Sequence, residues 1–168
     1  LFFRIAPEPD AKDVSYVIAG LNQAGLGLSD KNYYLKDNER MNSIRAEYKK
    51  YIVNVFKLIG YDEAAAVKKM EAVFEFEKTL AGNSYTKLEL NDPQKNYNKM
   101  PLASLNEVCP ELNWDTYFSE IGLSNPGEIN VSQKPYFENL GKNIYGTDLE
   151  IIKSYMELAL IRNNASVL

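Results

Sequence analysis

Two consecutive helical patterns over residues 37–82 are the feature that most constrains the fold of this chain. In each pattern, apolar residues recur at steps of three and four, which is typical of a helix with one buried face. Only a few residues around "GYD" separate the two patterns, so we expect the helices to be antiparallel neighbours. The residues expected to bound them are Asp37 or Asn38 and Asp62 at the starts, and Gly60 and Gly82 at the ends.

The first residues instead indicate two short extended arms around a polar turn. Leu1–Ile5 forms the first arm, and Tyr16–Leu21, rich in residues that favour strands, forms the second. We expect Pro7 and Pro9 to end the first arm, because proline cannot donate a ladder hydrogen bond.

The remaining sequence indicates a polar loop and then shorter helices. Residues 83–100 are polar and irregular, and helical patterns follow, with Asn113 as a cap and Trp114, Tyr117, Phe118 and Ile121 as the buried positions of the second. We therefore predict a mainly α fold, a single antiparallel helical domain over residues 1–168. It would carry a small β-hairpin at about residues 1–22 and helices from about residue 37 onward.

Charge and residue counts exclude several classes of site. The net charge of -4 argues against a nucleic-acid binder, which needs a cationic face, and no apolar run approaches the roughly 20 residues of a membrane span. The chain has no histidine, so neither a histidine zinc site nor a Ser-His-Asp triad can form from these residues. Its single cysteine, Cys109, cannot form an intrachain disulfide, and we expect it to be a buried, inert thiol.

Four further patterns suggest chemistry, but for each we prefer an explanation without a functional site. Gly25 and Gly27 lack the third glycine and the lysine of a phosphate loop, so we expect a turn. Glu71 and Glu75 lie one helical turn apart near lysines, which is typical of a solvated helix face. The pair Glu111 and Asp115 matches an E-x-x-x-D ligand motif, but Pro110 and Asn113 interrupt the helix that such a motif needs. Asn130 and Asn164 each begin a glycosylation sequon, a short pattern that we attribute to chance.

These residues alone therefore predict no catalytic, cofactor-binding or metal-binding site, and they leave substrate-binding residues unknown. On this basis the chain is a scaffold, a lid or an interaction module.

The segment "LNQAGLGLSDKNYYL", residues 21–35, resembles a signature of the neprilysin-like zinc metallopeptidases. This group includes neprilysin, endothelin-converting enzyme and bacterial oligoendopeptidase O. Ser29 stands where that family usually has proline. The residues that fit the signature are Gln23, Gly25, Leu26, Gly27, Leu28, Tyr33, Tyr34 and Leu35.

The resemblance extends over nearly the whole chain. The hairpin segment before the signature fits, and Phe76, Glu77, Leu80 and Ala81 supply the helix ending Phe-Glu-x-x-Leu-Ala. "NKMPLASLNEVCPELNWDTYF" and the closing stretch from Tyr136 are similar to later segments of the family's helical N-terminal region. No single motif is highly specific, but their order and spacing together are.

The resemblance implies a noncatalytic helical segment of a zinc metalloendopeptidase that cleaves oligopeptides, forming part of the wall of its substrate cavity. In the family the zinc ligands lie in a separate catalytic region, so zinc would be bound outside this segment. Its partners would be that catalytic domain of the same polypeptide and, through the parent enzyme, peptide substrates. The resemblance transfers no binding role to the arginines Arg4, Arg40, Arg45 or Arg162.

The origin of the segment is also an expectation. The chain does not begin with Met and ends at "NNASVL", so we expect it to be part of a longer protein. The single cysteine fits a bacterial relative, whose parent protein would be in the periplasm or cell envelope. The alternative hypothesis is a stand-alone helical interaction module with no enzymatic role.

Overall fold

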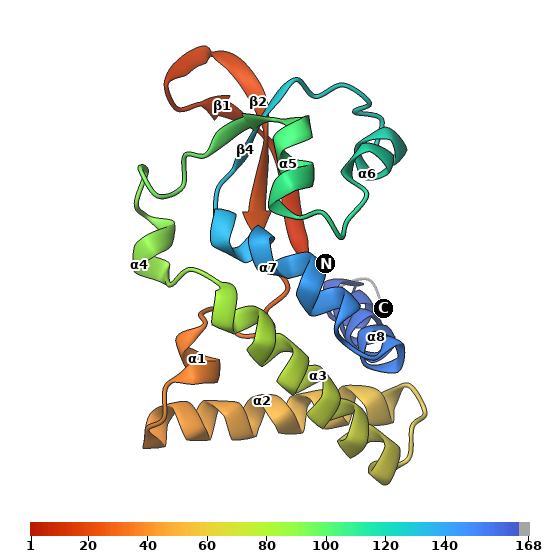
Figure 1. Cartoon of the computed structure of the whole chain (residues 1–168). Coiled ribbons are helices and arrows are strands. Elements are labelled where there is room, and N and C mark those ends of the chain that lie inside the picture. The colour runs from red at the N-terminus through yellow and green to blue at the C-terminus, as the bar shows by residue number, and fades with distance from the viewer. Residues whose placement is uncertain (165–168) are drawn as a thin grey trace. The chain divides into compact units, whose positions relative to one another are not determined.

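The computed structural model describes residues 1–164, which form eight helices and four strands (Figure 1). The predicted mainly α fold with a hairpin at the N-terminus is confirmed. The chain folds into two compact units. The helical unit holds Leu1, residues 25–82 and the described residues from 146 on, and the sheet unit holds residues 2–24 and 83–145. That residues 1–168 act as a single domain stays a prediction.

The sheet unit is built on four strands in the order β1-β2-β4-β3. β1 and β2 form the antiparallel hairpin, β2 pairs with β4 in parallel, and β3 pairs with β4 in an antiparallel manner. β4 pairs with β2 only at positions 19–21, so the rest of the hairpin extends beyond the other strands (Figure 1). The strands are β1 (Phe3–Asp10), β2 (Asp13–Gln23), β3 (Lys99–Pro101) and β4 (Glu128–Val131).

The prediction that Pro7 and Pro9 end the first arm is wrong, because β1 continues through both prolines to Asp10. Pro7 lies opposite Ala19 and Pro9 lies opposite Val17 in the hairpin. β1 is an edge strand with a neighbour on one side only, where an antiparallel ladder uses the amide of every second residue. Two prolines spaced by two residues can therefore occupy the positions whose amides the ladder does not need.

Asn130 in β4 connects three segments of the sheet unit. Its side chain is only 6% exposed and accepts a hydrogen bond from the amide of Asn98 at 2.7 Å. Its amide nitrogen donates to Glu8 Oε1 in β1 at 2.9 Å and to the carbonyl of Asn96 at 3.0 Å. These bonds attach the loop before β3 to the strands, a long-range arrangement that the local sequence pattern of residues 83–100 did not reveal.

Asp10 fixes the end of the hairpin through a buried carboxylate. It accepts hydrogen bonds from Lys99 Nζ at 2.8 Å, the amide of Lys12 at 2.9 Å and the hydroxyl of Tyr97 at 2.8 Å. Lys99 also pairs with Glu128 at 2.9 Å. The bond from Lys99, followed by those from Lys12 and Tyr97, holds the pKa of Asp10 well below its ordinary value despite burial.

In the sheet unit, the ring of Phe3 in β1 packs against the rings of Trp114, Tyr117 and Phe137, which lie in helices. Asn113 caps α6 as predicted, accepting from the amide of Thr116 at 3.0 Å. Trp114 and Phe118 are buried, but the prediction that Tyr117 and Ile121 are buried is wrong: Tyr117 is half-buried, and Ile121, which follows the last turn of the helix, is 43% exposed. The helices of this unit are α4 (Lys87–Leu90), α5 (Leu102–Val108), α6 (Trp114–Glu120) and α7 (Lys134–Tyr145).

The helical unit consists of α1 (Asn32–Leu35), α2 (Glu39–Leu58), α3 (Glu63–Asn83) and α8 (Leu149–Asn164). After the short link, α3 runs back across α2 (Figure 1). Of the two predicted alternatives, Asn38 caps α2 by accepting from the amide of Met41 at 2.9 Å, and Asp62 caps α3 as expected. Gly60 has a φ of +103° and ends α2 as predicted, whereas α3 continues through Gly82.

The core of the helical unit forms where α2, α3 and α8 present apolar side chains. The rings of Phe76 and Tyr155 meet edge to face with their centroids 4.9 Å apart. Tyr155 in α8 is buried, whereas its neighbour Met156 is 41% exposed, and Ile59, which follows the last turn of α2, is 42% exposed. The buried side chains of α2 are Tyr48, Ile52, Val55 and Phe56.

We predict that replacing Asn130 destabilises the sheet unit. Asn130→Ala leaves the amide of Asn98 and the carboxylate of Glu8 without their partner and should lower the free energy of unfolding by about 2–3 kcal/mol. Urea unfolding followed by circular dichroism measures this change. The control is Asn125→Ala at an exposed position, and equal effects of the two substitutions would contradict the assigned role.

A second prediction concerns the pH dependence of stability. Because the folded-state pKa of Asp10 is lowered, its stabilising contribution is present above the unfolded-state pKa of about 3.9 and is lost as the pH falls below it. Urea unfolding should show that Asp10→Asn is less stable than the original chain at pH 7, with a difference that shrinks toward pH 2. Lys99→Met should weaken the same pH dependence, and a constant difference would rule this explanation out.

Candidate functional site

The most highly connected polar group of the helical unit is the carboxylate of Glu77 in α3, which is 0% exposed. The hydroxyl of Tyr34 in α1 donates to Oε2 at 2.8 Å, and the hydroxyl of Tyr48 in α2 donates to the same oxygen at 2.8 Å. Arg162 in α8 places Nη1 3.6 Å from Oε1. One carboxylate therefore connects all four helices of this unit.

The glycine-containing loop contacts the same group through Tyr34. The amides of Gly27 and Leu28 donate to the Tyr34 hydroxyl at 3.0 and 2.9 Å. A Cβ at Gly27 would overlap the hydroxyl of Tyr48, so the chain can pass here only without a side chain. Because both amides already have an acceptor, they are not available to a phosphate, and the interpretation of this segment as a turn is confirmed.

Gly25, the other glycine of the loop, allows a contact with a second tyrosine hydroxyl. Gly25 has a φ of +98°, a conformation that favours glycine, and its carbonyl accepts from the hydroxyl of Tyr155 at 2.9 Å. The Tyr155 hydroxyl also lies 3.3 Å from the carbonyl of Leu1. The two glycines thus allow the loop to approach two tyrosine hydroxyls closely.

The pKa shifts of Glu77 and its two tyrosine partners are consistent with a structural role. Burial raises the pKa of Glu77, while the hydroxyls of Tyr34 and Tyr48 and the charge of Arg162 act in the opposite direction. Burial, followed by the charge of Glu77, raises the pKa of both tyrosines, so they remain neutral donors. A carboxylate with no exposed surface cannot contact a substrate in this conformation.

Glu77 belongs to a family motif in the sequence, but the motif does not indicate that its carboxylate is buried. Val73, Glu77 and Leu80 lie at steps of four and three on α3, and both apolar neighbours are fully buried. A glutamate within the apolar stripe of a long helix was therefore the signal that could have indicated a buried acidic group.

Cys109 is buried, as predicted. Burial is the main cause that raises the pKa of its thiol, which opposes formation of the reactive thiolate. Glu111 Oε2 lies 3.9 Å from the sulfur.

The two carboxylate pairs occupy unrelated environments. Glu71 and Glu75 are exposed on α3, and Glu75 pairs with Lys78 at 3.5 Å, as expected of a solvated face. Glu111 precedes α6, whereas Asp115 lies within it and accepts from Asn106 at 3.2 Å. The E-x-x-x-D spacing therefore does not lie on one helix.

The remaining residues considered in the sequence are the two glycosylation sequons and the four arginines. The side-chain amide of Asn130 is buried and hydrogen-bonded, so it is not accessible to a glycan in the folded unit, and Ser166 of the second sequon lies outside the described residues. Arg162 faces Glu77, Arg45 bonds backbone carbonyls near α1, and the remaining two are exposed. That none of the arginines binds substrate stays a prediction.

Within residues 1–164, the side chains do not form a group of three or more Cys, Asp or Glu residues able to hold a metal ion. Together with the lack of histidine in the sequence, this shows that the described residues do not fit a zinc site. In the same range, every helix is too short or too polar to cross a bilayer.

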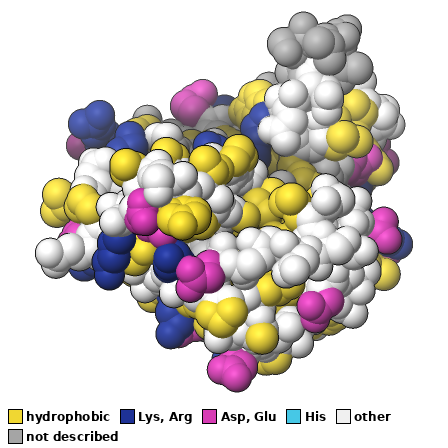
Figure 2. All heavy atoms as spheres, turned by 90° about the horizontal axis from the view of Figure 1, so that it is seen from above, with side chains coloured by type: hydrophobic (Ala, Val, Ile, Leu, Met, Phe, Trp, Pro, Cys, Tyr) yellow, Lys and Arg dark blue, Asp and Glu magenta, His cyan; other side chains and the backbone are white. Residues whose placement is uncertain are grey.

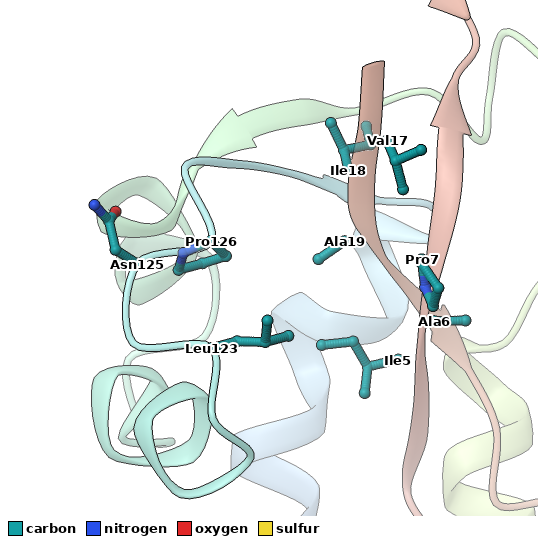
Figure 3. Close-up of a pocket in the computed structure, with 9 residues that line it drawn as sticks. All are labelled: Ile5, Ala6, Pro7, Val17, Ile18, Ala19, Leu123, Asn125 and Pro126. Atoms are coloured by element: carbon teal, nitrogen blue, oxygen red, sulfur yellow. The ribbon is translucent and has the colours of Figure 1, made fainter. Parts of the chain in front are cut away.

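The sheet unit carries an open apolar groove of about 460 Å³ (Figure 3). Ile5 in β1 and Leu123 after α6 point toward one another across it, while Asn125 turns away. Val17 in β2 is 69% exposed at its margin. The groove contains no charged side chain and therefore offers contact area without a catalytic group.

Charged side chains are mixed on the face shown in Figure 2. Acidic and basic groups are interspersed there, and hydrophobic side chains form small groups between them. On that face, the net negative charge is therefore not collected into one patch.

The helical unit carries a second pocket, of about 520 Å³, between α1, α2 and α3. Its lining is more polar and includes the cationic side chains Arg45, Lys49 and Lys78. Unlike the apolar groove, this pocket has the groups to recognise a charged ligand.

Comparison with known proteins identifies similar sequences over the whole chain. The model of peptidase family M13 matches residues 1–168. Endothelin-converting enzyme 1 of Homo sapiens is 30% identical over 172 residues, covering 99% of this chain and 22% of the human protein. The Cavia porcellus enzyme is also 30% identical, with 99% and 23% covered. The chain thus spans less than a quarter of the length of these relatives.

Solved structures share the fold. The zinc metalloprotease Zmp1 of Mycobacterium tuberculosis, solved with an inhibitor, has a TM-score of 0.90 and 24% identity, covering 98% of this chain and 25% of Zmp1. PepO from Lactobacillus rhamnosis HN001 has a TM-score of 0.71 and 14% identity, covering 95% of this chain and 25% of PepO. At these identities the likeness concerns the fold alone.

The hydrogen bonds around Glu77 predict a large effect of removing one hydroxyl. Tyr34→Phe leaves two loop amides without their acceptor and removes one of the two tyrosine donors of Glu77, and should lower the free energy of unfolding by about 2–3 kcal/mol. Tyr145→Phe removes a hydroxyl from an exposed side chain and should change it by less than about 0.5 kcal/mol. Urea unfolding of both variants provides the comparison, and similar values would refute the role assigned to Tyr34.

Proposed function

Since the chain belongs to peptidase family M13, we propose that it is the noncatalytic N-terminal helical segment of a zinc metalloendopeptidase that cleaves oligopeptides. The observation that carries this proposal is the combination of a family match over residues 1–168 with the absence of any histidine among them. Relatives of this chain include proteins named as zinc metalloprotease and converting enzyme, and they are about four times its length. The catalytic groups therefore belong to a part of the parent protein outside these residues.

The proposal assigns zinc to that other part as well. The acidic groups and the thiol that are most buried here already serve the fold: Glu77 binds two tyrosines, Asp10 binds Lys99, and Cys109 is enclosed. These contacts support the proposal that this segment supplies no step of the hydrolysis.

What the segment contributes, in this proposal, is part of the wall that encloses the peptide substrate and restricts entry to it. A wall must keep its shape while substrates enter and leave, and the carboxylate of Glu77 joins all four helices of one unit. The partner of the segment is the catalytic region of the same polypeptide.

The isolated chain of 168 residues tests the first half of this proposal. After dialysis against zinc and then against buffer, metal analysis should find much less than one zinc ion per chain, and a fluorogenic oligopeptide should remain intact. The coding sequence downstream of Leu168 should contain an H-E-x-x-H motif followed by E-x-x-x-D. Stoichiometric zinc, turnover by the isolated chain or an immediate stop codon would each overturn the assignment.

The parent protein tests the second half. It should cleave a short peptide readily and the same sequence much more slowly when that sequence is held in an accessible loop of a stable folded domain. An unstructured protein that carries the same sequence serves as the control for chain length. Equal rates on the short peptide and the folded domain would contradict a role in restricting entry.

A further inference from the structure

The pocket of about 520 Å³ in the helical unit contains one cation whose charge is not neutralised. Both terminal nitrogens of Arg45 already have partners: Nη1 donates to the carbonyls of Tyr33 and Lys36 at 3.0 and 2.7 Å, and Nη2 lies 3.3 Å from Asp37 Oδ1. Lys78 pairs with Glu75 at 3.5 Å. The remaining cation of the pocket is Lys49.

The ammonium of Lys49 contacts an aromatic ring and is not paired with a carboxylate. Its Nζ lies 4.3 Å from the ring centroid of Phe74, and within residues 1–164 it has no ion pair or hydrogen bond. An ammonium above an aromatic face is positioned by the ring quadrupole but keeps its positive charge. It therefore has donors available on the side that faces away from the ring.

The apolar surface beside Lys49 further limits the ligand. Leu35 is 43% exposed at the pocket, and Ala46 is also exposed there. A multiply charged phosphate requires several convergent donors, whereas a single ammonium next to apolar surface matches a carboxylate next to an apolar group. Peptides carry this combination at their C-termini and at acidic side chains.

We propose that this pocket binds a carboxylate of a peptide, with the carboxylate at Lys49 Nζ and an adjacent apolar group against Leu35 and Ala46. The site goes beyond the proposed function, because it needs neither zinc nor the catalytic region. Its ligand is a monoanion, and the source is either an α-carboxylate or an acidic side chain.

A titration of the ¹⁵N-labelled chain, monitored by amide chemical shifts, tests the proposal. N-acetylleucine should shift the amide signals around Lys49 and bind with millimolar affinity. N-acetylleucinamide, which lacks the charge, should bind about fivefold more weakly. N-acetylglutamic acid α-amide presents only a side-chain carboxylate, so the tighter of the two acids identifies the source.

Substitutions locate the site. Lys49→Gln should reduce binding of N-acetylleucine by the same factor of about five, and Lys49→Arg should restore it. The matched control is Lys50→Gln, because Lys50 is the next residue on α2, pairs with Glu47 at 2.7 Å and does not line the pocket. The Lys50→Gln variant should bind N-acetylleucine with the same affinity as the unmodified chain.

Three outcomes would overturn the proposal: equal binding of the acid and the amide, unchanged binding by Lys49→Gln, or tighter binding of inorganic phosphate than of either acid. Each of these leaves the tests of zinc content and peptide hydrolysis unaffected. Failure of this site is therefore distinguishable from failure of the proposed function.

Discussion

The helical unit depends on how the fully buried carboxylate of Glu77 is satisfied by hydrogen bonds from protein groups. An acidic group without exposed surface is costly unless donors surround it, and here the donors come from other elements of the fold. The Tyr34 hydroxyl uses its whole capacity in this arrangement, since it accepts two hydrogen bonds from loop amides and donates one to Glu77. The loop, α1 and α3 can therefore adopt their positions only together.

Local signals in the sequence predicted local structure well. The caps Asn38, Asp62 and Asn113 were found because a cap is a contact between residues two or three positions apart. The pairing of β4 with β2 was not found, because its partners are more than a hundred residues apart and β4 is only four residues long. The buried role of Asn130 was missed for the same reason: its partners, Glu8 and Asn98, are distant in sequence.

The segment that revealed the family makes contacts that hold the fold together. The side chain of Gln23 pairs with both backbone groups of Tyr85, at 2.6 and 3.2 Å. Gly25 and Gly27 admit tyrosine hydroxyls, and Tyr34 binds Glu77. Each residue of the signature that can be assigned a role holds a turn or a helix in place. A family resemblance can thus rest on packing requirements and still identify a lineage of enzymes.

The prolines of the sheet unit have a consequence for association between molecules. Both outer strands of the sheet carry proline, at Pro7 and Pro9 in β1 and at Pro101 in β3. The outward edge of β1 lacks two amides in succession, so an extended strand from another molecule cannot complete a hydrogen-bond ladder along it. The same residues that the hairpin tolerates without cost therefore protect an exposed, partly apolar strand from growth into intermolecular sheets and fibrils.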